Sequence, residues 1–114
     1  MKKWQRRLKK VNDKFLNLLG MARRGGKLSL GHDAAIGSIV KNKAKLCIIS
    51  SEGSDRLKKE MTHACSFDGK NIPVLITEYE ILTLSKAIGS KAAVVTVDDE
   101  GFAKALLERY NKES

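Results

Sequence analysis

The sequence predicts a single α/β domain in which helices cover both faces of a small mixed central sheet. Three observations support this prediction. The chain has 114 residues, which suits one domain of ordinary size. Its composition, with 42% hydrophobic and 31% charged residues, is that of a globular protein. Short apolar runs alternate along the chain with longer amphipathic segments, as strands and helices do in α/β proteins.

The helices are indicated by apolar residues that recur at steps of three and four. Five such segments are predicted, from Trp4 to the glycines at 25–26, from Asp33 to Val40, from Ser54 to the turn at 68–71, from Thr77 to Gly89, and from Asp98 to Tyr110.

The helix ends carry their own signals. Ser54 is a suitable N-cap for the third helix. Thr77 and Glu80 have the spacing of a capping box for the fourth. The acidic run 98–100 places negative charge at the positive end of the last helix dipole.

The strands are expected where apolar runs are too short and too continuous for an amphipathic helix. Four are predicted, over residues 27–30, 46–49, 72–76 and 92–97. Pro73 stands at the start of the third, where a missing N–H is tolerated.

The net charge of +9 arises entirely within the first 27 residues. This segment holds ten lysines and arginines and one acid, Asp13, whereas the rest of the chain carries twelve residues of each sign. Such a concentration indicates a polyanionic partner, and a solvated basic face is the alternative. We interpret residues 1–12 as a basic amphipathic helical extension and residues 13–114 as the folded domain.

Several classes of protein are disfavoured. No apolar run approaches the roughly 20 residues of a membrane span, and no apolar stretch follows the basic N-terminus as in a signal peptide. We expect a cytoplasmic protein with no membrane partner, in which Cys47 and Cys65 are buried thiols. His32 and His63 have no carboxylate at ligand spacing, and no nucleophile, base and acid are grouped. We therefore expect no metal, no cofactor and no enzymatic activity.

The segment Gly31-His32-Asp33 differs in kind from the rest. It follows a predicted strand and opens a predicted helix, so backbone N–H groups and the positive end of the helix dipole should face outward beside Arg24 and Lys27. Polar side chains there could reach base edges of a nucleic acid while the cations contact phosphates. The simpler alternative is that Asp33 is an N-cap and Gly31 a turn residue.

Six short segments follow one another in a recognisable order. They are Leu18 to Lys27, Gly31, Lys43 to Leu46, Asn71 to Pro73, Lys86 to Gly89, and Asp99 to Ala103. This series resembles the kink-turn-binding ribosomal protein family, which includes the archaeal large-subunit proteins called seven-Ae and thirty-e, and the chain is most similar to its bacterial YlxQ-like branch. The resemblance extends over about residues 15 to 108, with order and spacing kept except for roughly one extra residue between Ile76 and Leu84.

The resemblance implies a three-layer α/β/α sandwich that binds kink-turn RNA, a helix–internal loop–helix element with sheared G·A pairs. In the family, a helix N-terminus with the pattern Gly-x-Asn-Glu-x-x-Lys enters the groove at those pairs. The pattern falls on residues 31–37 of this chain, with His32 at its first variable position. Gly31 matches, but the three polar positions hold Asp33, Ala34 and Gly37.

These three departures predict weakened or altered kink-turn selectivity, because polar contacts to bases contribute roughly 1–3 kcal/mol each. The second family contact is a loop before the last strand, here Ser90, Lys91 and Ala92. Four cations are expected to hold phosphates without reading the bases. They are Arg24, Lys27, Lys41 and Lys43.

We therefore expect a non-enzymatic RNA-binding protein, associated with ribosomal RNA or another structured RNA. The alternative is a protein-interaction module that kept the fold and lost specific RNA readout. In that case the stripe within residues 4–15, formed by Trp4, Leu8, Val11 and Phe15, would dock a ribosomal protein. A basic amphipathic helix can also lie on an anionic membrane, which we do not expect here.

Overall fold

The computed structural model describes residues 14–113. The predicted extension over residues 1–12 lies outside these residues, so the division of the chain at residue 12 stays a prediction. The elements follow one another as a first helix over residues 14–24, β1 (Leu28–Leu30), α2 (His32–Val40), β2 (Leu46–Ile49), α3 (Asp55–Ser66), a 3-10 turn (Phe67–Gly69), β3 (Val74–Ile76), α4 (Ile81–Ile88), β4 (Val94–Val97) and α5 (Glu100–Glu113).

The four strands form one mixed sheet in the order β1-β4-β2-β3. Strand β4 is antiparallel to both of its neighbours, and β2 runs parallel to β3. Leu30 at the end of β1 pairs with Val95, and Ile49 at the end of β2 pairs with Val94. The sheet thus has two distinct ends: β1 and β2 finish where β4 begins, and they begin where β4 finishes.

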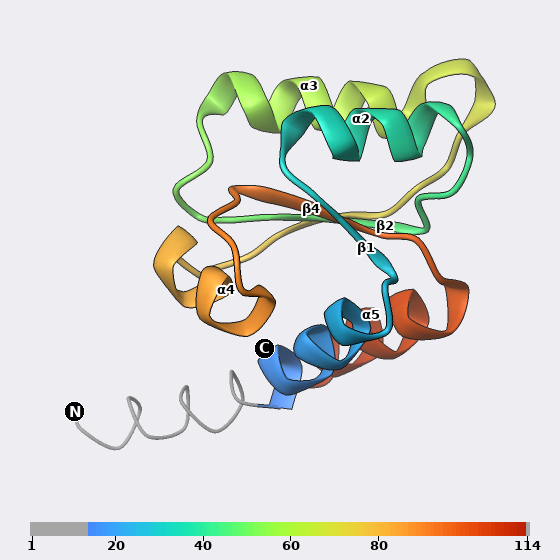
Figure 1. Ribbon diagram of the computed structural model, residues 1–114. Coiled ribbons are helices and arrows are strands. Elements are labelled where there is room, and N and C mark those ends of the chain that lie inside the picture. The colour runs from blue at the N-terminus through green and yellow to red at the C-terminus, as the bar shows by residue number, and fades with distance from the viewer. Residues whose placement is uncertain (1–13, 114) are drawn as a thin grey trace.

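The helices cover both faces of this sheet. Helices α2 and α3 lie on one face, and the first helix, α4 and α5 lie on the other (Figure 1). Side chains of β2 alternate between the two sides: Leu46 and Ile48 pack toward the first helix, whereas Cys47 and Ile49 pack toward α2 and α3. The predicted three-layer α/β/α sandwich is confirmed.

Phe15 is part of the core. Its side chain is 0% exposed, stacks on Tyr79 with ring centroids 5.4 Å apart, and meets Tyr110 edge-on at 5.3 Å. Phe15 is therefore unavailable to a docking partner. The other members of that predicted stripe, Trp4, Leu8 and Val11, lie outside the described residues.

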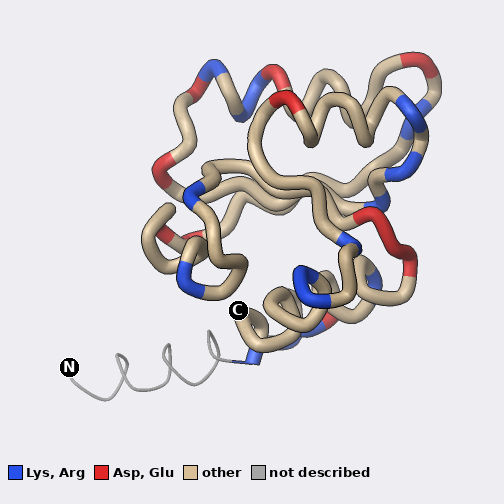
Figure 2. The backbone as a smooth tube through the Cα atoms, viewed as in Figure 1, with Lys and Arg blue, Asp and Glu red and all other residues tan. Residues whose placement is uncertain are grey.

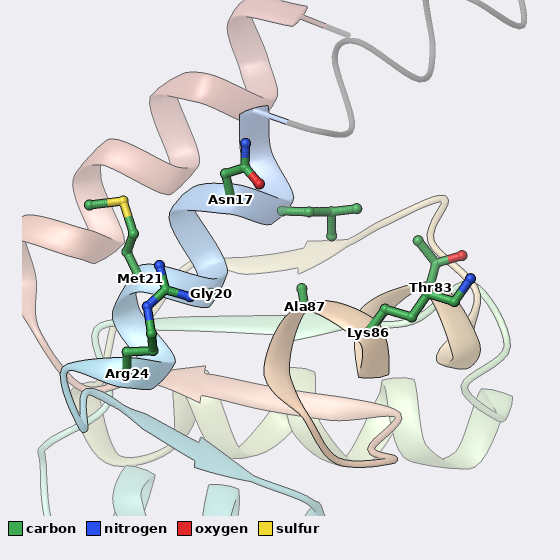
Figure 3. A pocket seen from close by; sticks show the side chains of 8 residues that line it. Asn17, Gly20, Met21, Arg24, Thr83, Lys86 and Ala87 are labelled. Carbon is green, nitrogen blue, oxygen red and sulfur yellow. The ribbon is translucent and has the colours of Figure 1, made fainter.

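The first helix packs closely against α4 (Figure 3). Arg23 Nε donates a hydrogen bond of 2.9 Å to the carbonyl oxygen of Ile88, the last residue of α4. A Cβ added at Gly20 would lie 3.2 Å from the carbonyl oxygen of Ala87, so glycine permits this close approach. These contacts bring the end of the first helix beside the loop that leaves α4.

Local signals predicted some helix ends and missed others. Ser54 Oγ accepts a 3.0 Å hydrogen bond from the Leu57 amide, as expected of an N-cap. The predicted capping box at Thr77 is wrong, because α4 begins only at Ile81. The Thr77 hydroxyl instead donates to the carbonyl oxygen of Ile49 at 3.0 Å. Strands β3 and β4 also begin two residues later than predicted, at Val74 and Val94.

The two cysteines are confirmed as free and buried. A hydrogen bond with Cys65 and burial together raise the pKa of the Cys47 thiol, which keeps it protonated. Within residues 14–113, no helix combines the length and apolar character needed to cross a membrane. The same part of the chain contains no cluster of three His, Cys, Asp or Glu side chains arranged to hold a metal ion.

Candidate functional site

Gly31 forms the turn between β1 and α2. It is the N-cap of α2, with φ of 90° and ψ of 167°, a conformation open to glycine and strained for other residues. Its N–H donates to the Val94 carbonyl oxygen at 2.9 Å, and its own carbonyl accepts from the Ala35 amide at 2.9 Å. Strand β4 therefore fixes the position at which α2 begins.

The N-terminus of α2 is open toward solvent. Among the described residues no side chain caps it, so the simpler alternative, in which Asp33 is the N-cap, is wrong. The side chain of Asp33 is fully exposed, and His32 and Ala34 are exposed beside it. Uncapped amides and the positive end of the helix dipole form a surface suited to an anion.

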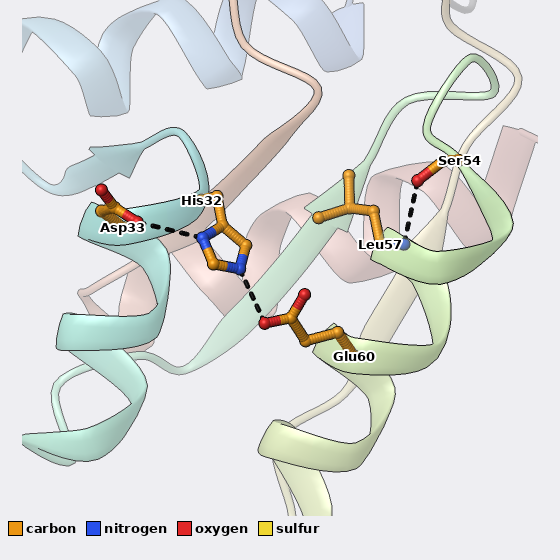
Figure 4. A network of polar contacts seen from close by, with 5 residues as sticks. All are labelled: His32, Asp33, Ser54, Leu57 and Glu60. Carbon is orange, nitrogen blue, oxygen red and sulfur yellow. Dashed lines mark hydrogen bonds and ion pairs between the residues drawn. The ribbon is translucent and has the colours of Figure 1, made fainter.

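Two carboxylates flank this surface and share one histidine. His32 Nδ1 lies 3.1 Å from Asp33 Oδ1, and His32 Nε2 lies 2.8 Å from Glu60 Oε2 on α3 (Figure 4). The hydrogen bond to Glu60, and then that to Asp33, raises the pKa of His32 above its ordinary 6.5. The arrangement carries one net negative charge when His32 is protonated and two when it is neutral.

Gly37 leaves the same face of α2 without a side chain. A Cβ at this position would meet nothing within 4 Å, and the backbone there is ordinary helix. Ala34 is exposed one turn earlier. The two positions at which the resembling family has glutamate and lysine are therefore outward-facing, and larger polar side chains would fit there without disturbing the core.

The loop over residues 89–93 lies at the same end of the sheet as Gly31. Gly89 ends α4 in a left-handed conformation, and Ser90 and Lys91 are exposed. The Ser50 amide at the end of β2 donates to the Ala93 carbonyl oxygen at 2.9 Å. Ala92 is only 8% exposed and packs into the core, so among the three predicted contact residues Ser90 and Lys91 offer exposed side chains to a ligand.

The predicted phosphate-binding lysines are not all at this end. The Lys27 carbonyl oxygen accepts from the Asp98 amide at 2.7 Å, where β1 begins and β4 finishes. Lys41 and Lys43 follow the C-terminus of α2, in the loop that leads to the start of β2. Figure 2 shows the cations of that loop at the sheet end away from the start of α2. The structure therefore separates Lys27, Lys41 and Lys43 from Gly31.

Asp98 connects the elements on either side of the Gly31 turn. Its carboxylate accepts three hydroxyl hydrogen bonds, from Ser29 Oγ at 2.5 Å, Ser38 Oγ at 2.6 Å and Thr96 Oγ1 at 3.0 Å. These hydroxyls come from β1, α2 and β4. The acidic run 98–100 was expected to place negative charge at the start of the last helix, where Asp99 accepts a 2.9 Å hydrogen bond from the Phe102 amide.

The sequence matches a family profile described as the ribosomal protein L7Ae/L30e/S12e/Gadd45 family over residues 13–107. The chain belongs to this family. Within it, the chain is 34% identical over 95 residues to the protein named RNA-binding protein YlxQ of Enterococcus faecium, covering 83% of this chain and 89% of that protein.

Solved structures agree with this L7Ae-family fold. A protein of unknown function from Bacillus halodurans C superposes with a TM-score of 0.80 at 29% identity, covering 86% of this chain and 97% of that one. The Giardia lamblia 15.5kD RNA binding protein superposes with a TM-score of 0.70 at 18% identity, covering 90% and 87% of the two chains. At that identity the second likeness concerns the fold alone.

Sequence reasoning missed Glu60 and the carbonyl of Val94, both of which shape the site in this L7Ae-family chain. Glu60 is 28 residues from His32 and faces it only because α2 and α3 pack side by side. The contact with Val94 could have been anticipated from the predicted strands. A strand antiparallel to β1 brings a backbone carbonyl beside the end of β1, where Gly31 stands.

Proposed function

We propose that the chain is an RNA-binding protein that holds structured RNA at the sheet end formed by Gly31, the start of α2, and Lys91. The observation that carries this proposal is the uncapped N-terminus of α2, fixed by Gly31 beside the exposed loop 89–93. Family membership supports it, since a relative at 34% identity is named an RNA-binding protein. The role we infer is binding rather than catalysis.

We further propose that the RNA contains a kink-turn and that selectivity for it is altered. Exposed Asp33 and Glu60 place negative charge at the contact surface, and Ala34 offers no hydrogen bond. Losing polar base contacts lowers discrimination by about 1–3 kcal/mol for each good pair. Affinity then depends more on phosphate contacts, from Lys91 and from the N-terminal cations, which carry no sequence information.

The test restores the three polar positions. The triple variant Asp33→Asn, Ala34→Glu, Gly37→Lys should bind kink-turn RNA more tightly and more selectively than the native chain. The three positions are outward-facing, so the variant should keep its fold. Affinity is measured for a kink-turn RNA and for a plain duplex of equal length across a salt series. A matched control, Glu108→Gln on α5, makes the same net change of one positive charge at an exposed position on the other face of the sheet.

The two RNAs separate the parts of the proposal. Equal affinity of the native chain for kink-turn and duplex at every salt concentration would contradict kink-turn binding. An unchanged preference in the triple variant would show that the start of α2 is not the contact surface. The RNA bound in cells, ribosomal or otherwise, is identified by crosslinking the cytoplasmic protein and sequencing the attached RNA.

A further inference from the structure

A hollow of about 540 Å³ lies between the first helix and α4. Its size falls in the range of small-molecule and nucleotide sites. Asn17, Met21 and Arg24 line it from the first helix, and Thr83 and Lys86 line it from α4 (Figure 3). We refer to this hollow as the helix groove.

The walls of the helix groove carry positive charge and two large apolar side chains, Met21 and the half-buried Leu16. Arg24 stands on one wall and Lys86 on the other, and no acid is among the described residues that line it. The Met21 side chain is 50% exposed, although it is large and apolar. Asn17 and Thr83 add polar groups that can both donate and accept hydrogen bonds. Such a set suits a ligand with an anionic part and a flat apolar part.

Helix α4 leads from the helix groove to the proposed RNA surface. Lys86, which lines the groove, lies one turn before Gly89, where the loop over residues 89–93 begins. The 2.9 Å hydrogen bond from Arg23 to Ile88 holds the first helix against the end of α4. A strand of RNA that contacts Lys91 can therefore continue into the helix groove without crossing an acidic side chain of its lining.

We propose that the helix groove holds an unpaired nucleotide of the RNA bound at the start of α2. The base packs against Met21 and the plane of the Arg24 guanidinium, and the phosphate lies near Lys86. Unpaired bases are commonly held this way, by stacking on flat or apolar side chains with cations along the backbone. This inference rests on the RNA-binding function proposed above.

An acidic protein helix is the less favoured occupant. Grooves that bind amphipathic helices are lined by a row of apolar pockets for successive anchor residues. Here Met21 and the half-buried Leu16 are the large apolar side chains, and the remaining described lining is polar or small. One base and one phosphate match this inventory better than a row of anchors does.

The experiment compares three RNAs and two pairs of variants of the full chain. The RNAs are a blunt-ended kink-turn and two extended versions of it, each with a short unpaired extension on a different strand. Lys86→Gln and Met21→Ala each alter the helix groove. Lys104→Gln on α5 and Leu82→Ala on α4 are matched controls, since both side chains are exposed and neither lines the groove. Circular dichroism verifies that each variant is folded.

The native chain should bind one extended RNA about tenfold more tightly than the blunt RNA, as expected for one stacked base. Lys86→Gln and Met21→Ala should each remove most of that gain and leave affinity for the blunt RNA within about twofold of the native value. The two control variants should keep the gain. A photoreactive base in the extension should crosslink to the first helix or α4.

Three results would overturn the inference: no gain from either extension, an equal loss on blunt and extended RNA, or crosslinks that map elsewhere, including to a partner protein. A free mononucleotide whose binding free energy equals the free energy that the extension adds to RNA binding would also contradict the inference. The site would then hold a nucleotide independently of the RNA surface. If the native chain binds no RNA at all, the proposed function itself fails.

Discussion

Replacing Gly31 with alanine tests how the start of α2 is built. An alanine at φ 90° and ψ 167° enters a strained backbone region at a cost of about 1–3 kcal/mol. The added Cβ would meet nothing within 4 Å, so no steric clash contributes to this cost. Alanine also lowers the conformational entropy of the unfolded chain, which offsets this cost by about 0.4–1 kcal/mol. The midpoints of these two ranges, about 2 and about 0.7 kcal/mol, predict that the free energy of unfolding falls by about 1.3 kcal/mol.

Gly37→Ala is the matched control, in the same helix and with equally open space around the new Cβ. Its backbone is regular helix, so alanine should stabilise the protein by about 0.5–1 kcal/mol. The two identical substitutions, six positions apart, should therefore change stability in opposite directions.

Urea unfolding followed by circular dichroism measures both changes as shifts of the midpoint at constant slope. RNA affinity provides a second measurement. Strain at Gly31 can be relieved by weakening the 2.9 Å hydrogen bond to Val94, which would displace the start of α2. A Gly31→Ala protein as stable as the native chain, with unchanged RNA affinity, would refute this reasoning.

Two further predictions concern Asp98, which binds hydroxyls of β1, α2 and β4, and His32 at the start of α2. Asp98→Ala should lower the free energy of unfolding by about 2–4 kcal/mol in urea titrations, because three hydroxyls lose their shared acceptor. Asp98→Asn keeps one acceptor oxygen and should cost less, and equal losses would contradict this account. His32 has a raised pKa in the folded protein, so it stabilises the fold fully below its ordinary pKa of 6.5 and progressively less as pH rises through the raised value. In urea titrations at a series of pH values, His32→Gln should remove this part of the pH dependence, and an unchanged profile would show that His32 does not titrate in contact with Glu60.

The fold could be predicted because each main element carries a strong local pattern. The apolar run at 46–49 is buried on both faces, and the stripe of α3 carries Met61 and Cys65 into the core. The start of α4 was predicted wrongly because a residue distant in sequence accepts the hydrogen bond of its first backbone amide. The Glu52 carboxylate accepts a 2.9 Å hydrogen bond from the amide of Ile81, the first residue of α4. The two residues are 29 positions apart, so the local spacing at Thr77 does not reveal this contact.

The candidate site was predicted in part. The turn at Gly31 and the loop with Lys91 are local features, and the sheet brings them together as the family resemblance implied. Lys41 and Lys43 were grouped with them because they belong to the same helix region in sequence. A helix of nine residues is about 13 Å long, which places its two ends on different parts of the surface.

This separation affects how charge and selectivity combine in the proposed function. Lys27, Lys41 and Lys43 lie at the end of the sheet opposite Gly31, so in the proposed function they attract RNA at long range without touching bases held at α2. In the same proposal, Asp33 and Glu60 repel phosphates at the start of α2, and protonation of His32 reduces that repulsion. Selectivity must then come from groups whose position is fixed, namely the backbone N–H groups at the start of α2, since mobile lysines contribute affinity to any RNA. The geometry of the Gly31 turn thus matters more for recognition than the number of cations around it.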